Sequence, residues 1–251
     1  MYNLKKTKKN TKRNHLEVPF EKKFLLFKFF KLGAKKLELF KILYSRNYSQ
    51  ATIQSLEKTP REFFLPYDKV DLAYENRPIK IGFGQTISQP SLVCEMIDKL
   101  QVMPHHNVLE IGTGIGYNAC LISNLANHIT TVEIVSELVQ RAKTRIRFCQ
   151  KQGIIRNNIS LIHGDGNQGF KSKSPYDRII VTCGSYKIPP DLIEQLKEGG
   201  IMIIPVKERE TNLEFLNIVT KIDGRINIRK DTSVRFVPFI RKNNMISKKI
   251  I

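Results

Sequence analysis

The residues best suited to do chemistry follow a short apolar run in the middle of the chain. Residues 108–111 are typical of a strand that is buried on both faces. Gly112, Gly114 and Gly116 come directly after it, and the lack of side chains there lets a ligand approach the backbone. Glu133 ends the next expected strand, about 20 residues after the first glycine, where a carboxylate can hold a ribose diol. This pattern predicts a nucleotide-type cofactor site.

The spacing of the glycines narrows the choice of cofactor. A dinucleotide fingerprint needs a glycine at position 117, and the residue there is Tyr117. The run Glu110-Ile-Gly-Thr-Gly-Ile-Gly116 instead resembles the first motif of class I S-adenosylmethionine-dependent methyltransferases. A glycine-rich turn between a strand and a helix also occurs for packing reasons alone. Glu133 and Asp165 favour the cofactor interpretation over that alternative.

A second group of functional side chains lies in the run Ile81-Gly-Phe-Gly-Gln-Thr-Ile-Ser-Gln-Pro90. Thr86 and Ser88 supply two hydroxyls just before a helix, whose start is indicated by Pro90. The apolar periodic residues of that helix are Leu92, Val93, Met96, Ile97 and Leu100. Ser88 is open to two interpretations. It is a helix cap, which contributes about 1 kcal/mol, or it binds a carboxylate beside the helix N-terminus.

The segments around these motifs alternate between strand and helix patterns. After the strand that ends at Glu133, the expected elements are a helix at 137–150, a strand at 159–162, a strand at 178–182, a helix from Pro189-Pro190 to Gly199-Gly200, a strand at 201–206, and two strands at 213–222 and 225–230 joined by an Asp223-Gly224 turn. This order predicts an α/β fold with a doubly wound, mostly parallel, Rossmann-like sheet and an antiparallel C-terminal edge.

Several phrases, taken together and in order, resemble protein-L-isoaspartate (D-aspartate) O-methyltransferases. They are Gly84-Gln-Thr-Ile-Ser-Gln-Pro90, Val108-Leu-Glu-Ile-Gly-Thr-Gly-Ile-Gly-Tyr117, His163-Gly-Asp-Gly166, Asp177-Arg-Ile-Ile-Val-Thr182, Leu196-Lys-Glu-Gly-Gly-Ile-Met-Ile-Ile-Pro-Val206 and Val234-Arg-Phe-Val-Pro238. The resemblance extends over residues 45–240. The first phrase is the most specific, because many methyltransferases share the glycine motif.

The resemblance implies roles for particular residues. Ser88 matches the catalytic serine and, with Thr86 beside it, would bind the substrate. The residues that match the cofactor turn are Glu110, Gly112, Thr113 and Gly114, with Glu133 for the ribose and Gly164, Asp165 and Gly166 beside the adenine. A lone Asp-Gly pair is otherwise more often a turn. The cofactor would be S-adenosylmethionine, with no metal.

The implied reaction is a protein repair step. A methyl group moves from S-adenosylmethionine to the α-carboxylate of an L-isoaspartyl residue in a damaged protein or peptide. A carboxylate is already ionised at neutral pH, so the reaction needs no general base. Two departures from the family pattern, Asn167 and the segment Cys183-Gly-Ser-Tyr-Lys187, put the affinity and the substrate range in question rather than the fold. Lys187 would suit an anionic substrate.

The charge of the chain is concentrated at its ends. The 251 residues carry a formal net charge of +19, most of it within residues 1–50 and 241–251. We therefore expect a basic N-terminal extension at 1–45, a methyltransferase domain at 46–240 and a basic tail at 241–251. Residues 2–13 are expected to be disordered, and residues 20–43 form an amphipathic pattern that suits packing on the domain, a membrane surface or a targeting segment.

The basic ends motivate two alternatives. One is a methyltransferase with another acceptor such as RNA, and the other is a non-catalytic relative anchored to a membrane or a partner. Contact of the ends with nucleic acid or membrane is the less favoured interpretation. The cysteines contain no Cys-x-x-Cys pair, which predicts reduced thiols, no metal site and a cytoplasmic location; they are Cys94, Cys120, Cys149 and Cys183. No apolar run reaches the roughly 20 residues of a membrane span.

Overall fold

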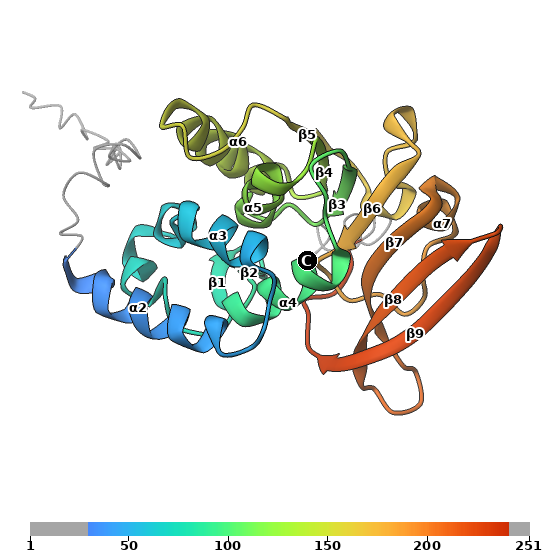
Figure 1. Cartoon of the computed structure of the whole chain (residues 1–251), viewed down its shortest axis with the longest axis horizontal. Coiled ribbons are helices and arrows are strands. Elements are labelled where there is room, and N and C mark those ends of the chain that lie inside the picture. The colour runs from blue at the N-terminus through green and yellow to red at the C-terminus, as the bar shows by residue number, and fades with distance from the viewer. Residues whose placement is uncertain (1–29, 241–251) are drawn as a thin grey trace, which may run out of the picture.

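The computed structural model describes residues 30–240, and its central element is a seven-stranded sheet (Figure 1). In spatial order the strands are β5 (Ile159–His163), β4 (His128–Glu133), β3 (Asn107–Ile111), β6 (Tyr176–Val181), β7 (Leu196–Lys207), β8 (Glu214–Ile222) and β9 (Arg225–Val234). The first five are parallel, and β8 is antiparallel to both of its neighbours. This confirms the predicted sheet with its antiparallel edge.

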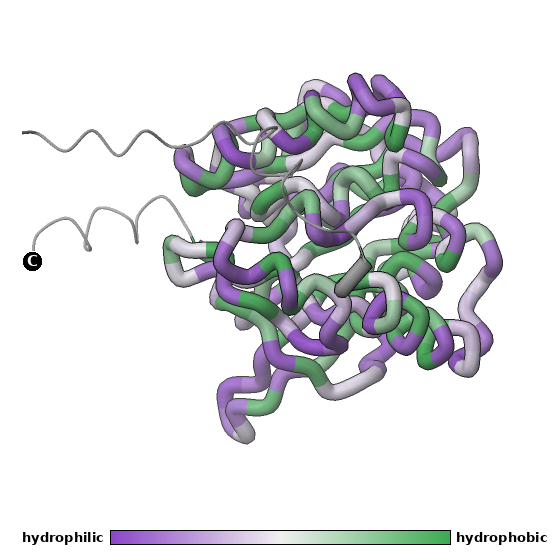
Figure 2. The backbone as a smooth tube through the Cα atoms, turned by 90° about the vertical axis from the view of Figure 1, so that its left-hand side faces the viewer, coloured by the Kyte–Doolittle hydropathy of each residue, from purple (hydrophilic) through white to green (hydrophobic). Residues whose placement is uncertain are grey.

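Helices cover both faces of the sheet. They are α4 (Pro90–Leu100), α5 (Tyr117–Leu125), α6 (Ser136–Lys151) and α7 (Pro190–Gln195). In β3, Val108 packs in the core beneath α4, α5 and α6, whereas Leu109 and Ile111 pack in the core beneath α7. Burial on both faces explains why this strand is an almost continuous apolar run. Figure 2 shows hydrophobic and hydrophilic stretches alternating along the chain, as expected for elements with one buried side.

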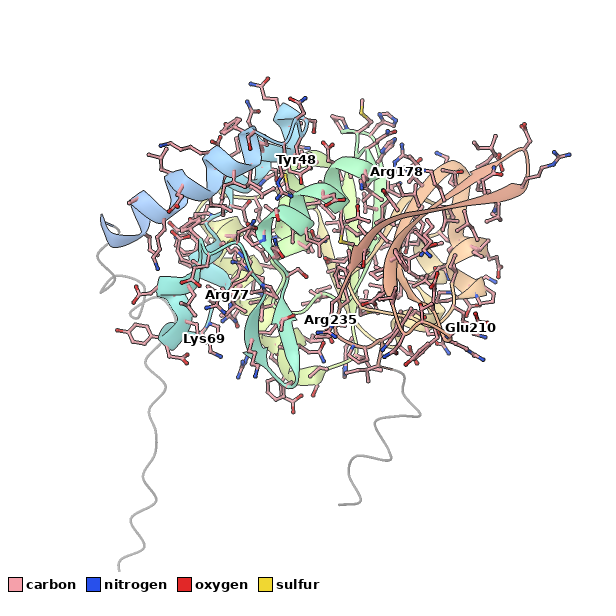
Figure 3. The ribbon with its side chains drawn as sticks, turned by 90° about the horizontal axis from the view of Figure 1, so that it is seen from below. Tyr48, Lys69, Arg77, Arg178, Glu210 and Arg235 are labelled. Atoms are coloured by element: carbon pink, nitrogen blue, oxygen red, sulfur yellow. The ribbon has the colours of Figure 1, made fainter. Side chains whose placement is uncertain are left out.

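The N-terminal part adds helices and a small hairpin beside the sheet. Its elements are α2 (Phe30–Tyr44), α3 (Gln50–Lys58), the 3-10 turns η1 (Arg61–Phe64) and η2 (Tyr67–Leu72), and the antiparallel strands β1 (Ile79–Gly82) and β2 (Gln85–Ile87). Figure 3 shows α2 and the β8–β9 hairpin at opposite ends of the molecule. Leu39, Phe40 and Leu43 of α2 are buried in the main core.

Helix α2 therefore packs on the domain. This was one of the three options that the amphipathic pattern of residues 20–43 left open, beside a membrane surface and a targeting segment. The part of that segment before residue 30 lies outside the described residues, as do residues 2–13 and the tail at 241–251. The domain boundary at residue 45 stays a prediction.

The prediction that Gly199-Gly200 ends a helix is wrong. Helix α7 ends at Gln195, and the two glycines lie inside β7. There the pairing with β6 shifts, because Tyr176 faces Leu196 while Arg178 faces Ile201. Gly199 has a φ of +74°, and a Cβ on Gly200 would lie 2.6 Å from the carbonyl oxygen of Lys197. The glycines thus allow a bulge in a strand.

The turn between β8 and β9 agrees with its predicted chemistry. Asp223 and Gly224 have φ values of +50° and +70°. Two consecutive residues with positive φ are what a two-residue hairpin turn of the primed type requires. The predicted helices at 137–150 and after Pro90 are likewise confirmed as α6 and α4.

Replacement of Leu43 by alanine tests the docking of α2. Leu43 is fully buried, whereas Leu37 of the same helix is 60% exposed. We expect Leu43→Ala to lower the free energy of unfolding by about 2–5 kcal/mol, and the control Leu37→Ala to change it by less than about 0.5 kcal/mol. Urea denaturation followed by circular dichroism measures both. Equal effects from the two variants would show that α2 does not pack as described.

Candidate cofactor and substrate site

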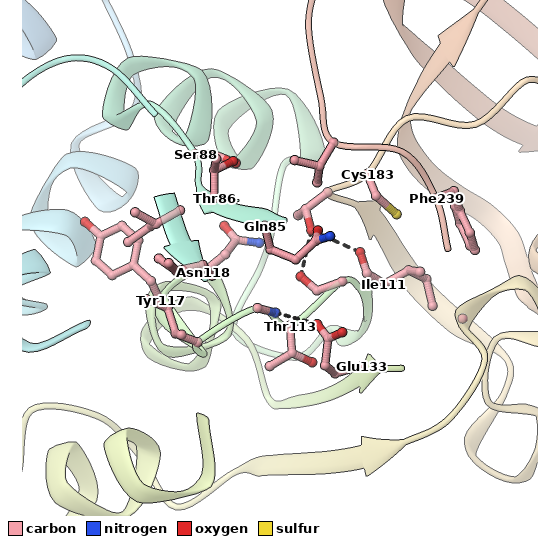
Figure 4. A pocket seen from close by; sticks show the side chains of 18 of the residues that line it. Gln85, Thr86, Ser88, Ile111, Thr113, Tyr117, Asn118, Glu133, Cys183 and Phe239 are labelled. Carbon is pink, nitrogen blue, oxygen red and sulfur yellow. Dashed lines mark hydrogen bonds between the residues drawn. The ribbon is translucent and has the colours of Figure 1, made fainter. Parts of the chain in front are cut away.

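A pocket opens at the carboxyl ends of β3, β4 and β6, where a parallel sheet usually binds its ligand (Figure 4). Its walls come from the β1–β2 hairpin, the turn after β3, the end of β4, the segment after β6 and residues 237–240. The predicted site residues among its lining are Thr86, Ser88, Gly112, Thr113, Gly114, Glu133 and Gly166. The fold thus brings together motifs that are far apart in the sequence.

The glycine turn after β3 has a conformation that side chains would block. Gly112 has a φ of +94°, and a Cβ there would lie 2.5 Å from the hydroxyl oxygen of Thr182. That hydroxyl lies 2.7 Å from the carbonyl oxygen of Gly112 and donates to it. Packing therefore requires the first glycine, as one interpretation proposed. Gly114, with a φ of +56°, lines the pocket as well, and its contact with a cofactor stays a prediction.

Glu133 is held rigidly at the wall of the pocket. Its side chain is buried, and its carboxylate accepts the backbone N–H of Gly114 at 2.8 Å, of Ile134 at 3.0 Å and of Val135 at 2.9 Å. Burial raises the pKa of Glu133, and the three N–H groups oppose that rise. A carboxylate has about four acceptor positions, so one position remains for a hydroxyl of a ligand.

Glu110 lies beneath the glycine turn and does not line the pocket. Its carboxylate accepts from the Asn118 amide at 2.8 Å and from the Thr131 hydroxyl at 2.5 Å. The Thr131 hydroxyl is also 2.5 Å from that of Thr113. Burial raises the pKa of Glu110 to about 7. Glu110 therefore braces two residues of the pocket, Thr113 and Asn118, from below.

The segment after β5 places one of its three predicted residues on the pocket. Gly166 lines it, and a Cβ there would lie 2.3 Å from Cγ2 of Ile111, so only glycine fits. The Asp165 carboxylate accepts the backbone N–H of Asn167 at 2.9 Å and caps a short turn. Gly164 donates its N–H to the carbonyl of Glu133 at 2.9 Å. Asp165 thus acts as a turn former here, and an adenine contact stays a prediction.

Thr86 and Ser88 present their hydroxyls to the pocket. Figure 4 shows both on the wall opposite Glu133. Within the described residues neither hydroxyl makes a hydrogen bond, so each is free to donate. The helix-cap interpretation of Ser88 is wrong, because α4 begins at Pro90 after Gln89. The backbone N–H of Ser91 is instead bound by the Asn76 side chain at 3.0 Å.

Part of the pocket was not foreseen from the sequence. Asn118 lines it from the first turn of α5, and Phe239 lines it from the C-terminal segment. That segment is held in place by Gly184, whose N–H donates to the carbonyl of Val237 at 2.9 Å and whose carbonyl accepts from Phe239 at 2.8 Å. The phrase at 234–238 was the only sequence signal for it. Lys187 is exposed and does not line the pocket.

Between residues 30 and 240, no group of three or more His, Cys, Asp or Glu side chains could hold a metal ion. Cys94, Cys120, Cys149 and Cys183 form no disulfide within these residues. None of the helices within residues 30–240 combines the length and the apolar composition that a membrane span requires.

Comparison with known proteins agrees with this geometry. The family model for protein-L-isoaspartate(D-aspartate) O-methyltransferase matches residues 34–244. A protein-L-isoaspartate O-methyltransferase from Dictyoglomus thermophilum is 43% identical over 190 residues, which cover 76% of this chain and 83% of the relative. One from Ignicoccus hospitalis is 37% identical over 213 residues, which cover 83% of this chain and 98% of the relative.

Solved structures give the same result. A protein-L-isoaspartate O-methyltransferase superposes with a TM-score of 0.71 at 30% identity, over 81% of this chain; the match spans 65% of that protein's length. A methyltransferase from Plasmodium falciparum in complex with S-adenosyl-L-homocysteine has a TM-score of 0.70 at 22% identity, over 82% of this chain and 98% of its own, which supports the fold. The chain belongs to the protein-L-isoaspartate(D-aspartate) O-methyltransferase family.

Proposed function

We propose that this protein transfers a methyl group from S-adenosylmethionine to the α-carboxylate of L-isoaspartyl residues in damaged proteins. The observation that carries the proposal is the pair of unbonded hydroxyls, Thr86 and Ser88, on the pocket wall opposite the glycine turn. Two hydroxyl donors without an adjacent base suit an acceptor that is already an anion. Family membership favours this acceptor over RNA and over a non-catalytic role.

The pocket suits the cofactor by the shape and charge of its walls. When bound, S-adenosylmethionine supplies an electrophilic methyl group. Glu133 would accept a ribose hydroxyl at its remaining acceptor position, since three backbone N–H groups fix its carboxylate. Gly112 and Gly114 would let the ligand approach the backbone, and Gly166 would leave room beside Ile111. Glu110 would support the cofactor turn from below, and Asp165, which caps the turn after β5, would lie beside the adenine.

The acceptor side needs alignment more than acid–base chemistry. Ser88, as the catalytic residue, and Thr86 would each donate a hydrogen bond to the substrate carboxylate and so fix the direction of its attacking oxygen. Holding two reactants in a productive orientation can remove a large part of the barrier of a bimolecular step. The resulting methyl ester is a better electrophile than a carboxylate. Attack by the following backbone nitrogen releases methanol and gives a succinimide, whose hydrolysis restores some normal aspartate.

Two further assignments belong to the proposal. The four free cysteines support a cytoplasmic location, where thiols stay reduced. We keep residues 46–240 as the methyltransferase domain and residues 1–45 and 241–251 as its basic extensions. Contact of these extensions with nucleic acid or membrane is the less favoured alternative.

The first test is methyl transfer to a synthetic peptide. With labelled S-adenosylmethionine, we expect base-labile label on an isoaspartyl peptide and none above background on the peptide with normal aspartate. Only the isoaspartyl peptide presents its α-carboxylate on a side branch. If a preparation that binds S-adenosyl-L-homocysteine labels neither peptide, the acceptor is a different one.

Removal of the Ser88 hydroxyl tests whether this side chain binds the carboxylate that accepts the methyl group. Ser88→Ala should lower kcat/KM for the isoaspartyl peptide by about 10- to 100-fold, the value of a hydrogen bond to a charged group. The affinity for S-adenosyl-L-homocysteine, measured by calorimetry, should stay within about twofold, because the assigned contact involves the peptide. An equal loss of affinity for S-adenosyl-L-homocysteine would contradict the assignment of Ser88 to binding of the methyl acceptor.

Replacement of Glu133 by a neutral residue tests whether its carboxylate binds the ribose of the cofactor. Glu133→Gln should weaken binding of S-adenosyl-L-homocysteine by about tenfold or more, because a charged acceptor is replaced by a neutral amide. Glu137→Gln, at an exposed position in the first turn of α6, is the matched control and should bind as the unmodified protein does. Unchanged affinity in Glu133→Gln would contradict the ribose assignment.

A further inference from the structure

Arg61 is a buried cation that does not line the pocket, so binding of the cofactor or of the methyl acceptor does not by itself explain why an arginine stands there. Its side chain is 1% exposed, at the start of η1. The guanidinium donates to the carbonyl oxygens of Ala73 and Ser88, each at 2.7 Å, and more weakly to that of Arg77 at 3.5 Å. Among the described residues it forms no salt bridge with a carboxylate. Burial lowers the pKa of Arg61 to about 10, so it keeps its charge at neutral pH.

The neighbours of Arg61 belong to two walls of the pocket. Ser88 follows β2 and carries the proposed acceptor hydroxyl. The ring of Tyr117, at the start of α5 directly after the glycine turn, has its centroid 6.0 Å from the guanidinium carbon. Tyr117 and Ser88 both line the pocket. One side chain thus spans from the acceptor segment to the cofactor turn.

The acidic residue next to Arg61 in the chain forms no salt bridge with it. The carboxylate of Glu62 instead accepts a short hydrogen bond from the hydroxyl of Tyr74. Burying a cation without a counterion costs much free energy, and an apolar side chain of similar size would often pack as well or better. The backbone carbonyls offset part of this cost. A purely structural role therefore explains the arginine poorly.

We propose that Arg61 is a positioning residue, which holds the backbone of Ser88 against Tyr117 and thereby sets the distance between the acceptor hydroxyl and the cofactor turn. The planar fork of a guanidinium reaches several carbonyls at once in fixed directions, which a lysine ammonium does not. This inference rests on the proposed function, since it assigns Ser88 to the acceptor.

The experiment compares Arg61→Lys and Arg61→Gln with the unmodified protein, each also combined with Ser88→Ala. If Arg61 acts through Ser88, both variants lower kcat/KM for the isoaspartyl peptide by about tenfold or more in the unmodified background, because small displacements cost large factors in rate. In the Ser88→Ala background the further loss should be below about threefold, because the group that Arg61 positions is gone. Affinity for S-adenosyl-L-homocysteine should stay within about twofold throughout, which also shows that the variants fold.

Arg145→Lys is the matched control. Arg145 is a half-buried arginine whose pKa burial also lowers to about 10, but its guanidinium donates to the carbonyl of Arg141 within α6. We expect this variant to keep both kcat/KM and the affinity for S-adenosyl-L-homocysteine.

Three outcomes overturn the proposal. They are unchanged activity of both Arg61 variants, an equal loss with and without Ser88, and loss of S-adenosyl-L-homocysteine binding in both variants, which would mark Arg61 as a core residue. Failure of the proposed function is a separate result, because the unmodified protein would then leave the isoaspartyl peptide unlabelled.

Discussion

The hydrogen bonds between the Glu133 carboxylate and the backbone N–H groups around it are the interaction on which the site depends. The bond to Gly114 ties the end of β4 to the turn after β3, and the bonds to Ile134 and Val135 fix the chain where it enters α6. A parallel sheet brings these two strand ends together but leaves their loops free to vary. The carboxylate ties these segments together, so we expect the floor of the pocket to be largely preformed when a ligand enters.

Three buried ionisable side chains lie around this pocket. Glu110 and Glu133 lie below the turn and Arg61 lies behind the acceptor wall, and each is held by hydrogen bonds to backbone or side-chain groups in place of an opposite charge. Such groups lower stability compared with apolar replacements, but they fix orientation where the chemistry needs it. Away from the pocket, the sheet and its helices pack mainly through two clusters of aliphatic and aromatic side chains.

Local pattern was sufficient to predict the sheet, α4 and α6, because each carries a periodicity that depends only on which face is buried. Local pattern gave wrong predictions where the role of a residue depends on which other segments of the chain it contacts. Gly199 and Gly200 have the composition of a helix stop but absorb a shift between β6 and β7, and Ser88 stands one residue too early to cap α4. The contribution of Phe239 to the pocket depends on Gly184, 55 positions earlier in the numbering, and Arg61 meets Ser88 through the tertiary fold alone. Packing between distant segments decides such contacts, so no single window of sequence contains them.

The antiparallel hairpin at the end of the sheet has a consequence for the behaviour of the protein at high concentration. Among the described residues β9 is one of the two edge strands of the large sheet, the other being β5, and an edge strand offers unpaired backbone groups to any similar strand it meets. Arg225, Arg229 and Lys230 are exposed along it. Two such edges would bring like charges together before their backbones could pair. Arg229 and Lys230 also face the carboxylates of Asp231 and Glu208, so we expect the repulsion between two β9 edges to come mainly from the net positive charge of the strand.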